Sequence, residues 1–343
     1  MNWIKYCTAY LVPITTWISF NSQGIFAYLP LLVFFGIVPF LELMIPTREE
    51  YNDSESTRKD PIIYDFLLYS MVPIQLFFLF YFVFNVSSWS ETPALIGRII
   101  SMGIMCGIIG INVGHELGHR MRRWEKLLGE ILLMTSLENH FTPYHNRGHH
   151  TYVATPKDPA TARKNEPLYV FWFRSHFGSY LQAWQIEFQR MKISKRSKFS
   201  LSNSMIIYTI LHITLCTSIF FIFGIKPLLL FLVAAGIGIL LLETVNYIEH
   251  YGLLRKQREN GTYERVQRWH SWNSNHILGR VILFELSRHS DHHYKADKPY
   301  QLLETHDTSP TMPSGYPGMM LLSTIPPLFF AIMNKLVELE NNK

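Results

Sequence analysis

Hydrophobic residues in this chain gather in runs of about 20 residues, separated by polar segments of unequal length. A helix of about 20 apolar residues crosses the roughly 30 Å hydrocarbon core of a membrane. The first run contains Pro13, but it has no small-residue cleavage site and is interpreted as a span, not a signal sequence. The pattern therefore predicts six membrane-spanning helices, at about 6–22, 25–46, 62–85, 93–113, 205–223 and 227–248.

Two long polar segments, 114–204 and 249–343, remain outside these spans and carry most of the Lys and Arg residues. Basic loops stay on the cytoplasmic side of a membrane. We therefore expect an all-α integral membrane protein of the inner membrane, with both polar segments folded as one cytosolic helical cap. The sequence shows no internal repeat, so residues 1–343 are interpreted as a single domain.

Composition narrows the possible chemistry. The chain is 48% hydrophobic with a mean hydropathy of +0.08, and its three cysteines include no CxxC pair. This excludes a disulfide scaffold, a Cys-ligated zinc site and an iron–sulfur module built from this chain. The net charge of +5 is concentrated in the membrane-flanking segments, with no separate basic stripe for nucleic acid.

Histidines are the most informative polar residues of the predicted cap. They occur in the segments HELGH, HNRGHH, NYIEHYGL and RHSDHH. Neutral imidazole binds iron, copper, zinc and nickel, and so many imidazoles are too many for one ion. The pattern predicts a dinuclear metal site with four or five nitrogens for each ion. The nine candidate ligands are His115, His119, His145, His149, His150, His250, His289, His292 and His293.

The spacing within these segments suits metal binding. His115 and His119 are separated by four positions, as are His145 and His149, so each pair shares one face of a helix. His289 and His293 repeat this spacing. We expect each triplet to offer two ligands on one face and a third ligand to a neighbouring ion. The remaining histidines lack such a pattern and are interpreted as surface or hydrogen-bonded residues: His140, His176, His212, His270, His276 and His306.

Acidic residues lie in or near the same segments. Metal-bound imidazoles commonly donate their other N–H to a carboxylate. We expect Glu116, Asp158, Glu249 and Asp291 to accept such hydrogen bonds, and a carboxylate that bridges two ions remains open.

Two other functions fit parts of the pattern. HELGH has the spacing of a zinc hydrolase motif, with Glu116 as the base, but this function would leave the other histidines unused. A metal transporter would place ionisable residues along a path within the spans. The predicted spans offer few such residues: Asp65, Arg98, His212 and Glu243.

The motifs together resemble those of the integral-membrane alkane 1-monooxygenases, which are related to the membrane fatty-acid desaturases and hydroxylases. The resemblance covers about residues 20–335 and includes ATPKDPATAR, HSWNSNH and PSGYPG. NYIEHYGLLR followed by HSWNSNH narrows it from the desaturase superfamily to the alkane hydroxylases. The chain departs from the family pattern at Tyr144, where a glutamate is usual, and at Ser287 and Tyr294.

The resemblance implies a non-haem di-iron centre, without haem or flavin, held by the nine histidines above. It implies O2-dependent hydroxylation of medium-chain n-alkanes to primary alcohols, with electrons from rubredoxin and rubredoxin reductase as separate proteins. Phe34 and Phe35 are candidates to line the substrate cavity. Hydroxylation of an aromatic methyl group, as by a xylene monooxygenase, or of a fatty acyl chain stays open, because these reactions share the histidine set. Candidate residues for docking an acidic electron donor are Arg120, Arg122, Arg123 and Lys126.

Overall fold

A computed structural model describes residues 2–45, 47, 61–89 and 93–342. Helices are the main secondary structure of the described residues, where the only β pairing consists of two isolated bridges. Most of the polar segment 47–61, between the second and third predicted spans, lies outside the described residues.

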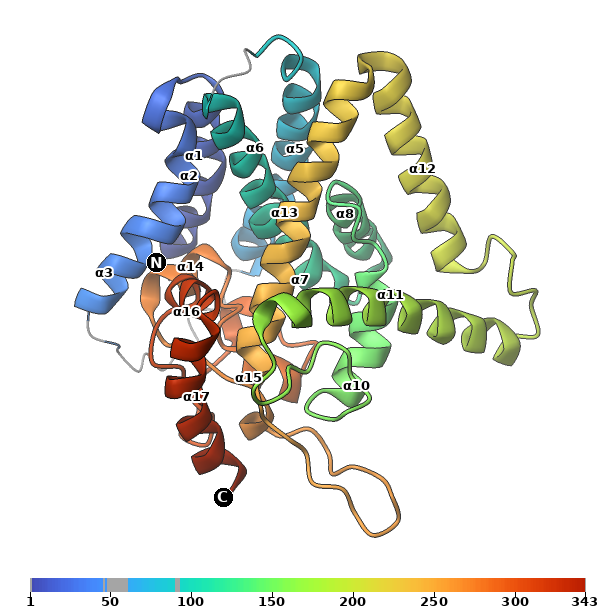
Figure 1. The fold of residues 1–343 in the computed structure, drawn as a ribbon. Coiled ribbons are helices and arrows are strands. Elements are labelled where there is room, and N and C mark those ends of the chain that lie inside the picture. The colour runs from blue at the N-terminus through green and yellow to red at the C-terminus, as the bar shows by residue number, and fades with distance from the viewer. Residues whose placement is uncertain (1, 46, 48–60, 90–92, 343) are drawn as a thin grey trace.

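The helices of the first half of the chain run between two ends of a bundle (Figure 1). Several are continuous runs in which α-helical, 3₁₀ and π-helical turns succeed one another. In chain order they are η1 Asn2–Tyr10, α1 Leu11–Phe20, η2 Gly24–Tyr28, α2 Leu29–Leu32, η3 Val33–Ile37, α3 Val38–Met44, α5 Pro61–Asn85, α6 Pro93–Met105, η4 Cys106–Val113 and α7 Gly114–Gly118.

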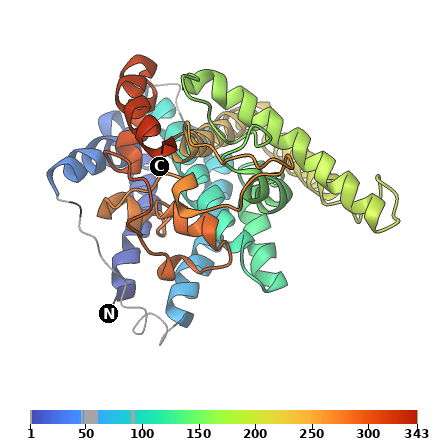
Figure 2. The same ribbon diagram turned by 90° about the horizontal axis from the view of Figure 1, so that it is seen from below.

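The second half contains two long membrane-type helices and many short helices. In chain order these are α8 Arg123–Met134, α9 Phe141–Tyr144, η5 His145–His149, α10 His150–Tyr152, α11 Leu168–Ile193, α12 Ser204–Phe223, α13 Ile225–His250, η6 Arg268–His270, α14 Ile277–Ile282, α15 His289–Tyr294, η7 Tyr300–Leu302, α16 Tyr316–Ser323 and α17 Pro326–Asn341. Figure 2 shows the short helices of 249–343 gathered at one end of the bundle, with α11 extending outward beside them.

Helices in five regions are long and apolar enough to cross a membrane, and they correspond to five of the six predicted spans. The remaining predicted span, 6–22, forms η1 and α1 and is not among them, so it stays a prediction. The five are Gly24–Met44, Ile62–Asn85, Pro93–Gly118, Ser204–Phe223 and Ile225–His250.

Helix α13 crosses the run formed by α6 and η4 at small residues. A Cβ atom at Gly103 would lie 2.5 Å from Ile237 Cβ, and one at Gly238 would lie 2.7 Å from Cys106 Cβ. Membrane helices lack a hydrophobic driving force between them, and small residues let their backbones approach closely. This close packing fixes the ends of α7 and α13, where His115 and His250 lie.

The segments on both sides of the last histidine triplet are anchored to α3. The Gly279 N–H donates a hydrogen bond of 2.7 Å to Glu42 Oε1, and a Cβ atom at Gly315 would overlap the Glu42 carboxylate. Gly315 belongs to PSGYPG, so this motif lets the backbone approach a buried carboxylate. The contact holds α14 and α16 beneath α3.

Candidate metal centre

The structure brings all nine predicted ligand histidines together at one end of the bundle. His115 lies in α7 and His119 follows it, His145 and His149 lie in η5, and His150 begins α10. His250 is the last residue of α13. Helix α15 carries the remaining three, His289, His292 and His293.

The ring nitrogens form two groups that could each hold a metal ion. The first consists of His115, His119, His145 and His292, and the second of His149, His250, His289 and His293. His150 joins the first group, because its Nε2 lies 3.0 Å from His145 Nε2. We call these the five-nitrogen group and the four-nitrogen group. They are adjacent, with the His145 and His149 ring centroids 5.1 Å apart.

The distances between nitrogens suit metal binding. Two nitrogens about 2.1 Å from one ion, at about 90–100° to each other, lie about 3.0–3.2 Å apart. The Nε2 atoms of His115 and His119 are 3.1 Å apart, and those of His115 and His292 are also 3.1 Å apart. In the four-nitrogen group, His289 Nε2 lies 3.1 Å from His250 Nε2 and 2.9 Å from His293 Nε2.

Burial favours the neutral form of six of these imidazoles. Burial lowers the pKa of His119, His145, His150, His289 and His293 well below its ordinary value, and neighbouring imidazoles lower it further. Burial also lowers the pKa of His292, to about 3. Neutral imidazole is the form that binds metal.

The prediction about the second triplet was partly wrong. His145 and His149 belong to different groups, although they are four positions apart, and His145 is paired with His150 instead. The cause is the π-helical geometry of η5, in which residues five apart, not four, lie above one another. The third triplet follows the prediction, since His289 and His293 share a group and His292 faces the other group.

One predicted carboxylate lies directly behind a candidate ligand. Asp158 Oδ2 accepts a hydrogen bond of 2.9 Å from His149 Nδ1. The Tyr144 hydroxyl donates to Asp158 Oδ1 at 2.6 Å, and the Thr161 hydroxyl donates to Oδ2 at 2.7 Å. Burial raises the pKa of Asp158, but His149 and these hydrogen bonds outweigh burial and set it to about 2. Tyr144, a departure from the family pattern, thus supports the carboxylate that orients His149.

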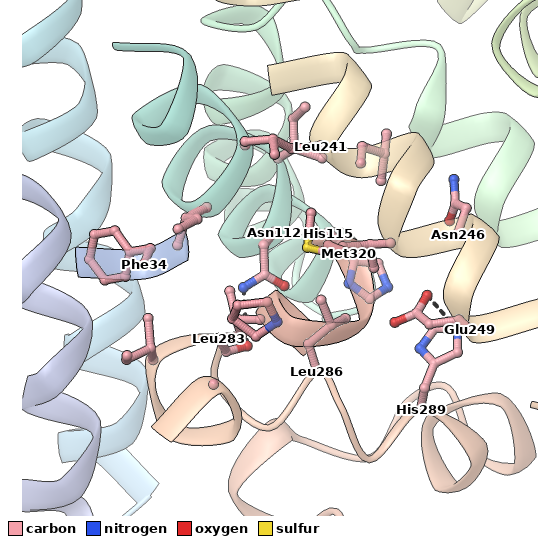
Figure 3. A pocket seen from close by; sticks show the side chains of 18 of the residues that line it. Phe34, Asn112, His115, Leu241, Asn246, Glu249, Leu283, Leu286, His289 and Met320 are labelled. Atoms are coloured by element: carbon pink, nitrogen blue, oxygen red, sulfur yellow. Dashed lines mark hydrogen bonds and ion pairs between the residues drawn. The ribbon is translucent and has the colours of Figure 1, made fainter. Parts of the chain in front are cut away.

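Glu249 lies on the other side of the imidazoles. Its Oε2 is 3.2 Å from His289 Nε2, the nitrogen that faces the group, and Oε1 accepts a 2.8 Å hydrogen bond from the Tyr316 hydroxyl. Figure 3 shows Glu249 and His289 together at the edge of a pocket. We expected Glu249 to accept a hydrogen bond from the imidazole nitrogen that does not bind metal. Instead its carboxylate lies beside His289 Nε2, where it could contact a bound ion.

The other two predicted carboxylates are engaged elsewhere. Glu116 Oε1 lies 3.3 Å from the Arg120 guanidinium and accepts a hydrogen bond from the Tyr300 N–H at 3.2 Å. Asp291 contacts Lys298 at 2.7 Å and Arg268 at 3.2 Å. Neither carboxylate has a hydrogen bond to a candidate ligand among the described residues. The engagement of Glu116 also removes the base that a zinc hydrolase would need.

The remaining departures from the family pattern have local roles. The Ser287 hydroxyl donates to the Ser274 carbonyl at 2.9 Å, which links the HSWNSNH segment to the turn before α15. The Tyr294 ring lies under the Arg268 guanidinium, 3.9 Å from its centroid. Ser287 and Tyr294 therefore support the backbone around the histidines and do not touch the nitrogens.

An apolar cavity of about 80 Å³ ends at the imidazoles (Figure 3). Phe34 and Phe35, the candidates for a substrate cavity, line it together with apolar side chains of η4, α13, α14 and α16. Its polar lining is concentrated near the metal-ligand candidates. These polar residues are Asn112, His115, His145, Asn246, Glu249 and His289.

Three π-helical segments surround this cavity and the imidazoles. Phe34 and Phe35 lie in η3, Asn112 lies in η4, and His145 and His149 lie in η5. π-helical turns are rare and frequent at functional sites. The sequence pattern does not reveal them, because a π turn differs from an α turn by one residue.

A further group of possible metal ligands has no recognisable pattern in the sequence. Glu138, His140 and His176 offer ligand atoms that all lie within 4.8 Å of one another. His140 and His176 are 36 positions apart, and neither is part of a repeated spacing. Only the packing of α11 against the turn after α8 brings them together.

The chain is similar in sequence to known enzymes over most of its length. Residues 87–322 match the family model described as fatty acid desaturase. The chain is 36% identical to alkane 1-monooxygenase 1 of Pseudomonas aeruginosa, over 98% of this chain and 90% of the relative. It is 38% identical to alkane 1-monooxygenase of Ectopseudomonas oleovorans, over 92% of this chain and 79% of the relative.

A more distant relative is the xylene/toluene monooxygenase hydroxylase component XylM of Pseudomonas putida, which is 26% identical over 98% of this chain and 89% of the relative. The identities of 34–38% to alkane 1-monooxygenases extend over nearly the whole chain. The chain therefore belongs to the alkane 1-monooxygenase family, within the larger fatty acid desaturase family.

Proposed function

We propose that this enzyme hydroxylates the terminal methyl group of medium-chain n-alkanes to give primary alcohols, with O2 as co-substrate. The proposal includes a non-haem di-iron centre, without haem or flavin, held by the nine histidines of the two nitrogen groups. The observation that carries it is the apolar cavity, which meets candidate metal ligands at His115, His145 and His289.

Iron bound by these histidines would supply the oxidising power for cleavage of an alkane C–H bond, which no protein side chain can provide. The protein supplies binding and orientation. Side chains such as Phe34, Leu241 and Ile111 enclose an alkyl chain and exclude water from the reacting end. Asp158 holds His149 with its Nδ1 proton outward, which leaves Nε2 free for metal.

Electrons come from rubredoxin, which is reduced by rubredoxin reductase. Rubredoxins are small acidic proteins, and a basic surface steers such a partner. Arg122 and Arg123 are exposed near the imidazole end of the bundle and suit this docking, together with Lys126. Arg120 does not, because its guanidinium is paired with Asp65 at 3.1 Å and with Glu116.

The imidazole end of the bundle is proposed to face the cytoplasm, with the chain as one domain in the inner membrane. The basic residues of 114–204 and 249–343 support this orientation through the positive-inside rule. The proposal retains 6–22 as a sixth span, which places both termini on the cytoplasmic side.

The decisive test is turnover by the purified chain in lipid nanodiscs with rubredoxin, its reductase, NADH and O2. We expect octane to be converted to 1-octanol and the protein to hold two irons per chain. Full activity in iron-free protein would contradict the di-iron centre. Turnover of only aromatic or acyl substrates would contradict the alkane assignment.

Phe34 offers a sharper test of the cavity. Its side chain is buried and lines the cavity, whereas Phe40 in the same helical run is exposed and does not. One methylene in an apolar pocket is worth about 1–3 kcal/mol. Phe34→Ala should raise turnover of longer alkanes relative to octane by about tenfold, and Phe40→Ala should leave that ratio unchanged.

A second candidate is hydroxylation of a methyl group on an aromatic ring. The likeness to XylM over nearly the full chain favours it over an acyl substrate. The same assay with p-xylene separates the two candidates. A metal transporter finds less support, because its candidate residues are held locally: Asp65 by Arg120, Arg98 by the Ser22 carbonyl, His212 by Asn139 and Glu243 by Asn246.

A further inference from the structure

Three metal-binding side chains meet outside the nine-histidine site. Glu138 and His140 lie in the turn between α8 and α9, and His176 lies in α11. Glu138 Oε1 is 3.3 Å from His140 Nε2 and 3.9 Å from His176 Nδ1. The three ligand atoms all lie within 4.8 Å of one another.

Burial leaves polar atoms of this group without partners. Glu138 is 1% exposed and His140 is 3% exposed. Glu138 Oε2 and His176 Nδ1 are buried and have no hydrogen-bond partner among the described residues. A buried polar atom without a partner is unfavourable, so these atoms indicate a site for a ligand.

Charge makes the same point when this group is compared with a second one. Asp291, Glu304 and His306 also lie close together, but Lys298 contacts both of these carboxylates. No Lys or Arg in the described part of the chain is paired with Glu138. Burial and the nearby buried carboxylate of Glu243 raise the pKa of Glu138 well above its ordinary value. A buried charge requires a partner, and a bound cation would neutralise Glu138.

The donor set suits a first-row transition metal. Two imidazoles and one carboxylate are a common protein ligand set for Zn²⁺, with a further position left for water. Ligand atoms at tetrahedral angles and about 2.1 Å from one ion lie about 3.4 Å apart. The observed 3.3 and 3.9 Å therefore need only small side-chain movements. The side chain of His176 is 28% exposed, which provides an entry path from solvent.

We propose that Glu138, His140 and His176 form a third metal site, which binds a divalent transition-metal ion of the zinc class. The ion joins the turn after α8 to α11. His140 lies five positions before His145, so the ion also braces the segment that carries the second histidine triplet. The site is independent of the proposed alkane hydroxylation.

The test uses the full chain in nanodiscs, first loaded with iron and then titrated with Zn²⁺ alone. Bound metals are counted by elemental analysis, and zinc affinity is measured by calorimetry. We expect the wild-type chain to bind one zinc in addition to its iron. His176→Gln should weaken this binding by more than about 100-fold, because loss of even an outer partner of a metal ligand costs 10–100-fold. Its iron content should not change.

His212→Gln is the matched control, because His212 lies nearby and bonds to Asn139 at 2.8 Å but is not part of the group. It should bind zinc as the wild type does. Glu138→Gln provides a second variant, which should also lose the zinc. Zinc should raise the unfolding temperature of the wild type but not of His176→Gln. Equal zinc binding by the wild type, His176→Gln and Glu138→Gln would overturn the proposal.

Discussion

The two nitrogen groups of the metal centre differ in their carboxylates. The four-nitrogen group has Asp158 behind His149 and Glu249 against His289. In the five-nitrogen group, no carboxylate of the described residues is hydrogen-bonded to an imidazole. One group therefore compensates for a missing imidazole with acidic side chains, while the other relies on neutral nitrogen alone.

The two nitrogen groups are therefore not equivalent, although both consist of imidazoles. Carboxylates neutralise part of the charge of a bound cation and orient its imidazole ligands. An ion in the four-nitrogen group would experience a more negative environment than its neighbour. We therefore expect the two positions to respond differently to the loss of one side chain.

Loss of a histidine should have the largest effect on iron content and turnover, and the effect should differ between the two groups. His289→Ala removes one of only four nitrogens, and we expect loss of half of the iron and at least a 100-fold fall in octane turnover. His150→Ala leaves four nitrogens in its group and should retain most of its iron. Elemental analysis and turnover on the same preparations test this, and equal iron loss in both variants would contradict the inequivalence of the groups.

Loss of the carboxylate behind His149 should have the next largest effect. Asp158→Asn retains the shape but not the charge, and we expect iron affinity to fall by about 10–100-fold. Asp291→Asn is the control, because Asp291 adjoins His292 in sequence but contacts Lys298 and Arg268. A competition assay with a chelator measures both variants. The assignment fails if Asp291→Asn loses as much iron as Asp158→Asn.

Glu249→Gln should separate metal binding from turnover. The carboxylate contacts the inner nitrogen of His289 at the edge of the cavity. We expect octane turnover to fall by about tenfold with a smaller change in iron content. Tyr316→Phe removes only the hydroxyl that holds Glu249 and should show a weaker form of the same effect. Unchanged turnover in Glu249→Gln would remove Glu249 from the site.

Tyr144→Phe should have the smallest effect. It removes one hydrogen bond to Asp158, which still accepts bonds from His149, Thr161 and the Ala160 N–H. We expect a loss of stability of about 1–2 kcal/mol, measured by denaturant unfolding, and only a small loss of iron. A loss of iron equal to that of Asp158→Asn would show that Tyr144 acts on the metal by another route.

The sequence predicted that these histidines lie close together, because helical spacing is a local property. His115 and His119 meet as their separation implies, and His250 reaches His289 from the end of α13. Five of the predicted spans correspond to helices because an apolar run of about 20 residues is also local. The four-residue helical spacing did not predict that His145 and His149 belong to different groups, because spacing in the sequence does not reveal a π turn.

The surroundings of the imidazoles were harder to predict because they depend on tertiary packing. Asp291 lies within the RHSDHH segment, yet Lys298 and Arg268 draw it away from the imidazoles. Asp158, by contrast, lies nine positions after His149, and the chain folds back so that its carboxylate meets that imidazole. The group of Glu138, His140 and His176 depends on where α11 crosses the turn after α8, and no spacing in the sequence encodes that crossing.

The π-helical turns have a consequence for how this chain tolerates changes in length. Each residue of an α-helix advances the rotation by about 100°, so one added or deleted residue turns everything that follows by that angle. Deleting one residue from Cys106–Val113 would restore regular hydrogen bonding, yet it would rotate His115 and His119 relative to α6. A substitution in a π-helical segment leaves the rotation of the following helix unchanged. A single-residue deletion there changes this rotation and misaligns the candidate ligands.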